Sequence, residues 1–269
     1  MKVDLSIIIP TYKRGNLVVD AIQSALKVED VMIEILVMDD CPEGSAESFV
    51  RTIQDKRVVY RKRNQPSGGF PALLRNECAS LAKGRYLYFL DDDDTVEAKT
   101  LAKMVHQLNR CRAGVAIAAV APHGPDGNRV VSAEKRQFSW VRDAFNRYKN
   151  NRFLLLSQLL FGTPMIVCSA CMIRKSCFER IGGFDHRLPL YEDVEMYIRS
   201  IRAFGFVFIN DVLLNRRTGE PSLINNEQDE IKTLQSYKMM YSNYRQANSW
   251  LELKALRLLR LFLPRPATS

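Results

Sequence analysis

Short apolar runs alternate with amphipathic segments through the first hundred residues. The apolar runs are predicted strands, and they lie at Leu5–Ile9, Ile33–Met38, Val58–Tyr60 and Arg85–Leu90. Helical periodicity separates them over Asn16–Leu26, Ala46–Ile53 and Phe70–Leu81. Strands that alternate with helices in this order pair in parallel, with the crossover helices on both faces of the sheet. The pattern therefore predicts an α/β fold with a doubly wound, mostly parallel central sheet.

The pattern is less regular in the rest of the chain, but it still predicts both kinds of element. Helices are expected over Thr95–Asn109, part of Glu134–Asn151, Lys175–Ile181 and Glu192–Phe204, and strands over Val115–Val120 and Phe206–Ile209. The polar segment Arg216–Asn226 is long enough to form a lid. Residues 226–269 are expected to add a C-terminal helical extension.

A 21-residue stretch from Phe153 to Ile173 contains no charged residue, so its length raises the question of a membrane span. Gly162-Thr163-Pro164 interrupts the stretch at its middle. A buried helix over Phe153–Phe161, a turn and a buried strand over Met165–Ile173 explain it better. We therefore predict no transmembrane helix.

The net charge of +9 is concentrated near the C-terminus. Residues 231–269 hold seven basic residues and one acidic residue, a net charge of +6. A nucleic-acid-binding protein more often carries such charge on a folded face with aromatic residues for stacking. We therefore expect no nucleic-acid partner.

The same segment contains an apolar helical stripe, formed by Leu251, Ala255, Leu258, Leu259 and Phe262. Lys254, Arg257 and Arg260 follow another side of the helix. A basic amphipathic helix of this kind over residues 250–263 suits a peripheral contact with an anionic membrane. Packing against the rest of the chain and packing against a second copy in a homodimer are the alternatives.

Six cysteines in a chain without a secretory signal predict free, mostly buried thiols in a reducing cytoplasm. Cys168 and Cys171 have CxxC spacing, but they lie in an apolar strand-like run, where residues three apart point to opposite faces. No second CxxC or histidine pair completes a tetrahedral set of ligands. A zinc or redox site is therefore not expected.

Polar side chains directly follow three of the predicted strands. Thr11-Tyr12 follows the first strand, Asp39-Asp40 the second, and the run Asp91-Asp92-Asp93-Asp94 the fourth. Open α/β sheets bind their ligands beyond the carboxyl ends of the strands. Carboxylates gathered there repel one another unless they share a cation or a ligand.

The four consecutive aspartates exceed what a helix cap needs, because one or two would satisfy the first turn. Their hard oxygen atoms suit Mg²⁺ or Mn²⁺, which commonly binds one or two carboxylates together with substrate phosphates. A carboxylate at Asp39-Asp40 could accept a hydrogen bond from a base N–H or from ribose hydroxyls. The sequence lacks a Gly-rich phosphate loop, so a diphosphate would be held by metal and side chains.

Six segments match a known family in its order: Ser6–Arg14 (SIIIPTYKR), Glu34–Asp40 (EILVMDD), Leu74–Asn76 (LRN), Gly84–Asp94 (GRYLYFLDDDD), Ile181–Asp185 (IGGFD) and Tyr191–Val194 (YEDV). Together they resemble the family 2 glycosyltransferases, which have the GT-A fold. The similarity spans roughly Val3 to Ser222. No single motif is decisive, but the ordered set is highly specific.

The resemblance implies a role for each matching residue. The implied donor-binding residues are Thr11 and Tyr12 beside the nucleotide base, Asp40 bonded to the base, Arg75 by the nucleotide and its phosphates, Asp91 on the ribose, and Asp92. Asp93, the second aspartate of the D-x-D pattern, would bind the metal. Asp193, the acid of the Glu-Asp pair, would be the general base.

The family inverts the anomeric centre of the sugar. The resemblance implies that the acceptor hydroxyl loses its proton to Asp193 and attacks C1 as the nucleoside diphosphate leaves from the opposite face. Such a displacement needs a base opposite the leaving group, and positive charge near the departing diphosphate. Taken alone, Glu192-Asp193 is better explained as an acidic pair at a helix N-terminus, and the aspartates upstream favour the catalytic interpretation.

Two family features are missing from this sequence. Many members carry a histidine in the loop matched here by Arg216–Ser222, where Arg216 or Arg217 could substitute electrostatically. Processive polysaccharide synthases of the family carry a Q-x-x-R-W motif and membrane helices. We expect neither that motif nor membrane helices in this chain. Their absence favours the addition of one sugar each time the acceptor binds.

We therefore expect an inverting glycosyltransferase that uses Mn²⁺ or Mg²⁺ and a nucleoside-diphosphate sugar, with UDP or dTDP favoured by Asp40. Its acceptor would be a hydroxyl of a glycan or of a lipid-linked saccharide. The expected divisions are a donor-binding half (residues 1–100), an acceptor-binding half with the base (101–225) and the basic helical tail (226–269). The expected location is the cytoplasm, with peripheral contact to the inner face of the cell membrane.

Two other functions fit parts of the same pattern. A nucleotidyltransferase of related fold also gathers aspartates after a parallel strand, but it would normally show a Gly-rich, basic loop in place of Pro10–Arg14. A non-catalytic module that binds sugar nucleotides or metal is the second alternative.

Overall fold

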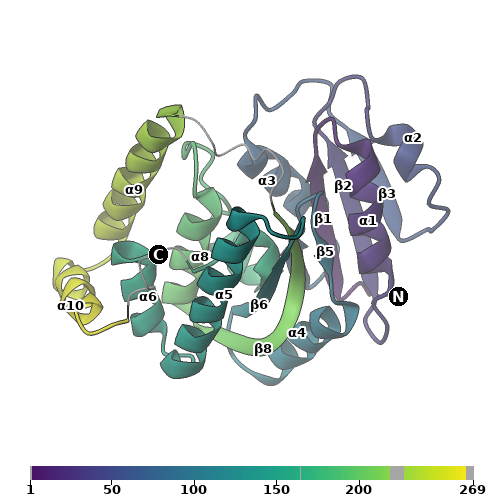
Figure 1. The fold of residues 1–269 in the computed structure, drawn as a ribbon. Helices are drawn as coiled ribbons and strands as arrows, with labels where there is room; N and C mark the ends of the chain where they lie inside the picture. The colour runs from purple at the N-terminus through teal and green to yellow at the C-terminus, as the bar shows by residue number, and fades with distance from the viewer. Residues whose placement is uncertain (1, 164, 219–226, 265–269) are drawn as a thin grey trace.

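The computed structural model describes residues 2–163, 165–218 and 227–264. Its centre is one mixed sheet with the strand order β3-β2-β1-β4-β7-β6-β8-β5 (Figure 1). The strands are β1 (Leu5–Thr11), β2 (Ile33–Asp39), β3 (Val58–Lys62), β4 (Tyr86–Phe89), β5 (Thr95–Val96), β6 (Val115–His123), β7 (Cys171–Arg174) and β8 (Phe206–Arg217).

Helices cover both faces of this sheet. They are α1 (Gly15–Leu26), α2 (Glu47–Val50), α3 (Pro71–Leu81), α4 (Ala98–Arg110), α5 (Arg129–Tyr148), α6 (Arg152–Phe161), α7 (Lys175–Arg180), α8 (Glu192–Phe204), α9 (Glu227–Ala247) and α10 (Trp250–Arg260). Ile8 of β1 belongs to the core shared with α3, α6 and α8, whereas Ile7 and Ile9 belong to the core shared with α1 and α4. Successive strand residues point to opposite faces, so a continuous apolar run needs a core on each side.

The first four strands confirm the predicted parallel arrangement. β1 pairs in parallel with β2 and β4, and β2 pairs in parallel with β3. The predicted helix over Ala46–Ile53 is shorter, because α2 ends at Val50. Side chains compete for its end groups: Asp39 accepts a hydrogen bond from the Ala46 N–H, and the Thr52 hydroxyl donates to the Phe49 carbonyl.

The second half departs from the predicted pattern in two strands. β8 does not end at Ile209 but continues to Arg217, paired with β6 as far as His123. The polar residues Asn210 and Asp211 interrupt the apolar pattern, and irregularities of register between Ala118 and Val120 accommodate them. Arg216 and Arg217, expected at the start of a loop, therefore lie in a strand. The remainder of that expected lid, residues 219–226, falls outside the described residues.

The uncharged stretch contains a helix, as predicted, but most of its second part is not a strand. α6 ends at Phe161, and the expected strand over Met165–Ile173 becomes a 3₁₀ turn at Cys168–Ala170 followed by β7. β7 runs antiparallel to both β4 and β6. None of the described helices is long and apolar enough to cross a membrane. All six cysteines are free thiols, and only Cys111 is partly exposed.

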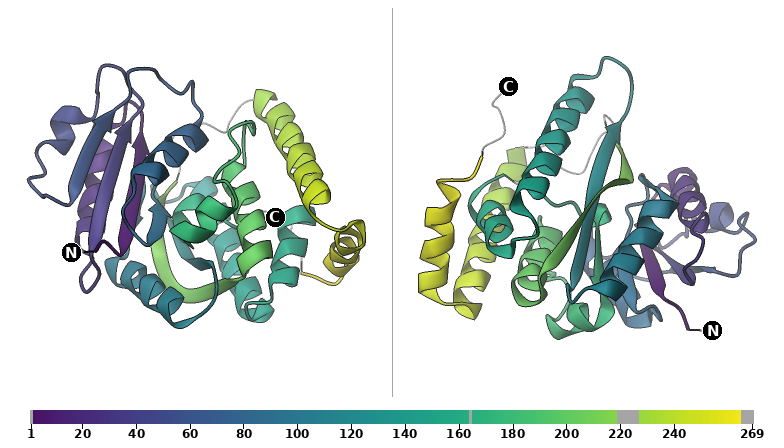
Figure 2. Two further views of the ribbon diagram at one scale, coloured as in Figure 1. Left: turned by 180° about the vertical axis from the view of Figure 1, so that it is seen from behind. Right: turned by 90° about the horizontal axis from the view of Figure 1, so that it is seen from below.

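Helices α9 and α10 form the C-terminal extension. Both lie at the end of the molecule opposite β1, β2 and β3 (Figures 1 and 2). α10 packs on α6, with Leu253 and Leu256 buried between them. The predicted mostly parallel sheet with flanking helices and C-terminal helices is therefore confirmed.

Candidate active site

The carboxyl ends of β1, β2 and β4 bring the predicted residues to one edge of the sheet. β1 lies between β2 and β4, and Thr11 is opposite Asp39 in the pairing. The Thr11 hydroxyl donates a 2.7 Å hydrogen bond to Oδ2 of Asp92, which ties the first strand to the aspartate run. Tyr12 follows with its side chain about half exposed, and the Lys13 ammonium lies 5.2 Å from the centre of its ring.

The aspartate run alternates between buried and exposed side chains. Asp92 and Asp94 are 6% and 4% exposed, whereas the side chains of Asp91 and Asp93 are 39% and 31% exposed. Asp92 is bonded to Thr11, and Asp94 accepts a 2.9 Å hydrogen bond from the Arg217 N–H. Two of the four aspartates are thus part of the fold, and Asp91 and Asp93 present their oxygens to solvent.

Burial strongly perturbs the two inner carboxyls of this run. It raises the pKa of Asp92 to about 6, opposed by the Thr11 hydrogen bond and the Arg14 charge. It raises the pKa of Asp94 to about 8, with the charge of Asp91 acting in the same direction. Burial therefore favours the protonated, neutral forms of both carboxyls, and positive charge beside them compensates by favouring the ionised forms.

Arg14 supplies part of that compensation. Its Nη1 lies 2.7 Å from Asp93 Oδ2 and 3.3 Å from Asp92 Oδ1. Among the described residues, no three histidine, cysteine, aspartate or glutamate side chains converge into a ready-made metal cage. The donor set still fits Mg²⁺ or Mn²⁺, because these ions commonly take one or two carboxylates and complete their shell with substrate phosphates and water. Asp93 and Asp91 are the exposed hard oxygen donors.

Asp39 and Asp40 are both buried and bonded within the donor half. Asp39 accepts from the N–H groups of Cys41 and Ala46 and from the Tyr60 hydroxyl, at 2.8 to 2.9 Å. Asp40 accepts from the Ser67 N–H at 2.8 Å and its hydroxyl at 2.7 Å. Arg63 Nη1 lies 3.3 Å from the same carboxylate. Asp39 thus holds a turn, and Asp40 holds the segment before α3. The base contact assigned to Asp40 stays a prediction.

Arg75 joins the two halves of the site. Its Nη2 lies 2.9 Å from Asp91 Oδ1 after β4, and its Nη1 lies 2.7 Å from Glu192 Oε1 at the start of α8. The side chain is buried, and its Nε has no hydrogen-bond partner among the described residues. The sequence interpretation placed Arg75 by the phosphates, and the structure places it between an exposed aspartate of the run and the acidic pair.

Asn76, the next residue, fixes the loop that leads to α8. Its side-chain amide donates to the Phe184 carbonyl and accepts from the Phe184 N–H, both at 2.9 Å. Gly183 adopts a φ of +70°, and a Cβ there would lie 2.5 Å from Asn76 Oδ1. The Arg-Asn and Gly-Gly-Phe motifs, far apart in the sequence, are therefore two sides of one contact.

Asp193 lies in the first turn of α8, which begins after Tyr191 in the left-handed conformation at a φ of 60°. Among the described residues it accepts only the 2.8 Å hydrogen bond from the Val194 N–H. Burial, reinforced by the charge of Glu192, raises the pKa of Asp193 to about 7. A helix N-terminus favours the ionised form, but desolvation outweighs it here. Such a carboxylate can accept a proton near neutral pH.

Asp185, the acid of the IGGFD motif, has the opposite environment. Arg187 bonds to both of its carboxylate oxygens, at 2.8 and 2.7 Å. These hydrogen bonds hold the pKa of Asp185 down to about 2. A carboxylate so firmly ionised is a weak base, so Asp185 serves the loop rather than proton transfer.

The sequence interpretation gave no role to several residues that shape the site. They are Arg14, Arg63, Ser67 and Ser169, whose hydroxyl accepts from the Asp91 N–H at 3.1 Å. Arg14 could have been found, because it follows the first strand within a matched motif. Two arginines occupy the loop position at which many family members carry a histidine. Nε of Arg216 lies 3.3 Å from Oε2 of Glu134, and Nε of Arg217 donates a 3.2 Å hydrogen bond to the Asp93 carbonyl.

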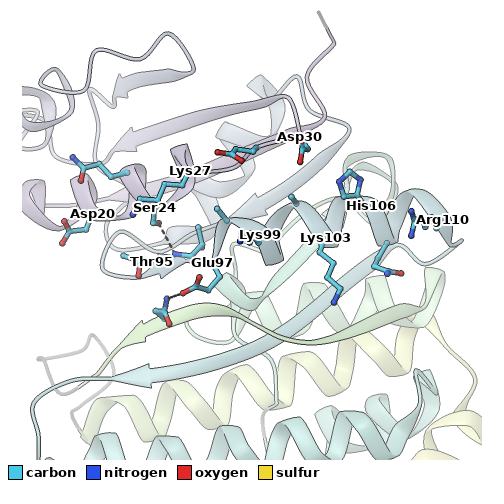
Figure 3. A pocket seen from close by; sticks show the side chains of 17 residues that line it. Asp20, Ser24, Lys27, Asp30, Thr95, Glu97, Lys99, Lys103, His106 and Arg110 are labelled. Carbon is cyan, nitrogen blue, oxygen red and sulfur yellow. Dashed lines mark hydrogen bonds between the residues drawn. The ribbon is translucent and has the colours of Figure 1, made fainter.

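A groove of about 1040 Å³ lies elsewhere, between α1 and α4 beside β5 (Figure 3). Its labelled side chains mix both signs of charge, and Glu97 at its floor bonds to the Asn215 amide at 2.8 Å. None of the residues predicted to bind the donor, the metal or the acceptor proton lines this groove.

Comparisons with known proteins show what the chain is similar to. The family model described as glycosyl transferase family 2 matches residues 6–182. The succinoglycan biosynthesis protein ExoO of Rhizobium meliloti is 34% identical over 143 residues, which are 52% of this chain and 38% of that protein. An uncharacterized glycosyltransferase of Rickettsia typhi, RT0329, is 24% identical over 245 residues, covering 89% of this chain and 71% of that protein.

Two solved structures show the same fold. S. aureus TarS in complex with UDP-GlcNAc superposes with a TM-score of 0.69 and 16% identity, covering 96% of this chain and 71% of that one. The mannosyltransferase PcManGT of Pyrobaculum calidifontis, in complex with GDP-Man and Mn²⁺, gives a TM-score of 0.66 and 16% identity, covering 97% and 70%.

The chain belongs to glycosyl transferase family 2, because the family model covers more than half of it. The resemblance drawn from the ordered motifs and the predicted fold are thereby confirmed. The chain spans little more than a third of the length of ExoO.

Proposed function

We propose that this protein is an inverting glycosyltransferase that moves one sugar from a nucleoside-diphosphate sugar to a hydroxyl of a glycan or lipid-linked acceptor. The observation that carries the proposal is the bridge through Arg75, which links exposed Asp91 to the acidic pair containing Asp193. Arg75 bonds both to Asp91, the proposed donor-side carboxylate, and to Glu192, whose neighbour Asp193 has its pKa raised to about 7. A glycosyl transfer needs both groups at one centre.

Asp193 is the proposed general base. It would accept the proton of the acceptor hydroxyl as that oxygen bonds to C1 of the donor sugar. The bond from C1 to the diphosphate breaks at the same time, and the nucleoside diphosphate leaves from the opposite face, which inverts the anomeric centre. A base ionised near neutral pH suits this role, because its affinity for the proton is matched to the working pH.

Asp93, with Asp91 beside it, is the proposed ligand set for Mn²⁺ or Mg²⁺. When bound there, the ion would supply positive charge for the diphosphate as it leaves. The structure of PcManGT with GDP-Man and Mn²⁺ supports this assignment within the fold. Arg14 is already bonded to Asp93 and would add a second positive charge near the same oxygens.

A pyrimidine donor, UDP- or dTDP-sugar, is the proposed substrate. Thr11 and Tyr12 would lie beside the base, and Asp40 at the end of β2 would accept its N–H. TarS was solved with UDP-GlcNAc, and the E. coli relative WfaP is named as a UDP-Glc-dependent β-1,3-glucosyltransferase acting on a diphosphoundecaprenol-linked GlcNAc. Both names support a uridine donor and WfaP's name supports a lipid-linked acceptor, whereas the GDP-Man bound to PcManGT makes GDP-sugars the alternative that the test below includes.

The test is donor turnover without an added acceptor. The protein is incubated with Mn²⁺ and, separately, with UDP-, dTDP- and GDP-sugars, and the release of nucleoside diphosphate is measured. We expect slow hydrolysis of a UDP- or dTDP-sugar and loss of the signal with EDTA.

Each alternative gives a different result when a parallel incubation replaces the sugar nucleotide by a nucleoside triphosphate and a sugar 1-phosphate. Release of pyrophosphate in that incubation would make the protein a nucleotidyltransferase, and binding of the sugar nucleotide without turnover in either would make it a non-catalytic module. Tighter binding of GDP than of UDP would refute the pyrimidine assignment and leave the transferase assignment standing.

A further inference from the structure

Helix α10 is apolar on two opposite faces, and only one of them is covered. Its inner face packs on α6 through Leu253 and Leu256, and the Ser157 hydroxyl of α6 donates a 2.7 Å hydrogen bond to the Leu256 carbonyl. The outer face, continued by the turn that follows the helix at Arg260, carries large side chains that are 57% to 83% exposed, namely Trp250, Leu251, Leu258, Leu261 and Phe262. We refer to these five residues as the outer face of α10.

The outer face is too apolar for a helix that ends in water. Leu251, Leu258 and Phe262 follow the stripe visible in the sequence, and the structure turns that stripe away from the protein. A helix that is hydrophobic all round is normally buried on every side. Large contiguous apolar patches on a surface mark a contact with a partner or a membrane.

The charges around the outer face are all positive. Lys254 and Arg257 are exposed, and the Lys254 ammonium lies 3.7 Å from the centre of the Trp250 indole ring. The acid of the helix, Glu252, is turned inward, where it bonds to Arg202 Nη2 and the Tyr244 hydroxyl, both at 2.7 Å. The outer surface of α10 therefore combines bulky apolar side chains with two exposed cations, for which the described part of the chain shows no carboxylate partner.

We propose that α10 binds an anionic lipid bilayer, lying in the plane of its surface with the outer face of α10 in the interfacial region. Trp, Phe and Leu on one face with flanking Lys and Arg are typical of helices that insert into the headgroup layer. Each cation near an anionic surface adds attraction that falls off within the Debye length. Contact with a second copy fits less well, because a two-fold interface would bring Lys254 and Arg257 of both copies together.

The position of α10 gives this contact an orientation. α9 packs over α8 and the loop before it. The Ser236 hydroxyl accepts a 3.1 Å hydrogen bond from the Leu190 N–H in the loop, and the Asn243 amide donates a 3.2 Å hydrogen bond to Glu195 in α8. α9 and α10 thus sit on the half that carries α8, away from β1, β2 and β3 (Figures 1 and 2). A bilayer bound by α10 would lie against that half of the molecule.

Sedimentation with lipid vesicles tests the proposal without any activity measurement. The full chain is mixed with vesicles of phosphatidylglycerol and phosphatidylcholine in equal parts, or of phosphatidylcholine alone. We expect binding to the mixed vesicles that is at least about tenfold stronger than to the neutral ones and that weakens as salt is added.

Two pairs of variants separate insertion from simple charge. Leu258→Glu with Phe262→Glu should weaken binding to the mixed vesicles by about tenfold or more, because two inserted side chains become charged. Val130→Glu with Met32→Glu changes two exposed apolar residues elsewhere and should bind as the wild type does. Lys254→Glu with Arg257→Glu should also weaken binding, whereas Lys83→Glu with Lys99→Glu, an equal change of charge, should weaken it less.

The substituted positions are exposed, so all variants should unfold at the temperature of the wild type, which thermal denaturation checks. The proposal would be overturned if the wild-type protein did not bind the mixed vesicles. It would also be overturned if the α10 variants and their controls lost vesicle binding equally. Self-association in the absence of lipid that is abolished by Phe262→Glu would overturn it too, because the outer face of α10 would then be an interface between copies.

Discussion

The acid pairs Asp39-Asp40 and Glu192-Asp193 place two carboxylates side by side in the sequence, but the fold surrounds them differently. In the first pair, Asp39 accepts three hydrogen bonds from a turn and from Tyr60, and Asp40 is bonded to Ser67 and Arg63. In the second pair, Arg75 binds Glu192, and Asp193 accepts only from its own helix among the described residues.

This difference separates carboxylates whose oxygens are bonded within the fold from one that has a single donor. A desolvated carboxylate with one donor and an anionic neighbour is poorly stabilised as an anion. Asp193 is of this kind, and its pKa rises to about 7. The number of donors therefore distinguishes the two pairs.

Asp193→Asn should produce the largest effect. The amide keeps the size of the side chain but cannot accept the proton of the acceptor, so transfer should fall by about 10²–10⁴-fold. Affinity for the donor nucleotide, measured by calorimetry, should be unchanged. Loss of that affinity would instead mean that Asp193 serves the metal or the fold, and normal turnover would leave Glu192 as the next residue to test.

The same substitution has a stability signature with a defined sign. Because the folded state raises the pKa of Asp193, it binds a proton more tightly than the unfolded state does. Ionisation then opposes folding as the pH rises from the unfolded pKa through about 7. At pH values above this range the Asp193→Asn variant, whose side chain stays neutral, should therefore melt no lower than the wild type. That result would exclude misfolding as the cause of lost transfer.

Asp93→Ala should have the next largest effect, on nucleotide binding. With Mn²⁺ present, calorimetry should show a loss of affinity for UDP of about 10²-fold, because the exposed carboxylate that links the ion to the diphosphate is gone. With EDTA present, wild type and variant should bind UDP equally. Asp143→Ala, which removes an exposed acid on α5, is the matched control. UDP affinity of the wild type that EDTA leaves unaltered would contradict the metal assignment.

Asp39→Asn should affect stability rather than chemistry. The new NH₂ group would face either the Cys41 N–H, bonded to Oδ1 in the wild type, or the Ala46 N–H and the Tyr60 hydroxyl, bonded to Oδ2, and would leave a buried N–H unpaired. We expect a loss of about 1–3 kcal/mol in the free energy of unfolding, measured with urea. Transfer by the fraction that remains folded should persist. A variant as stable as the wild type would show that the hydrogen bonds accepted by Asp39 do not stabilise the fold.

Glu192→Gln should have the smallest effect, on the pH dependence of transfer. In the wild type, activity should rise with pH through about 7 as Asp193 ionises. The charge of Glu192 raises that pKa, so its removal should move the rise to lower pH by about one unit. Glu179→Gln, at an exposed acid on α7, should leave the profile in place. A profile that does not move in Glu192→Gln would show that another group titrates.

Local patterns in the sequence determined most of the donor half. The apolar runs predicted β1, β2 and β4, and strand order alone placed Thr11, Asp39 and Asp91 at one edge of the sheet, because parallel strands end together. These features depend on residues that are close together in the sequence, so the sequence alone predicts them.

Tertiary structure alone decided which carboxylates bond to other side chains and which face of α10 is covered. Arg75 meets Asp91 sixteen residues away and Glu192 117 residues away, and no periodicity records such a pairing. The stripe of Leu251, Leu258 and Phe262 was visible in the sequence, but packing on α6 selected Leu253 and Leu256 instead. The length of β8 likewise follows from its partner β6. Desolvation and long-range pairing set these outcomes, and both exist only once distant segments have packed together.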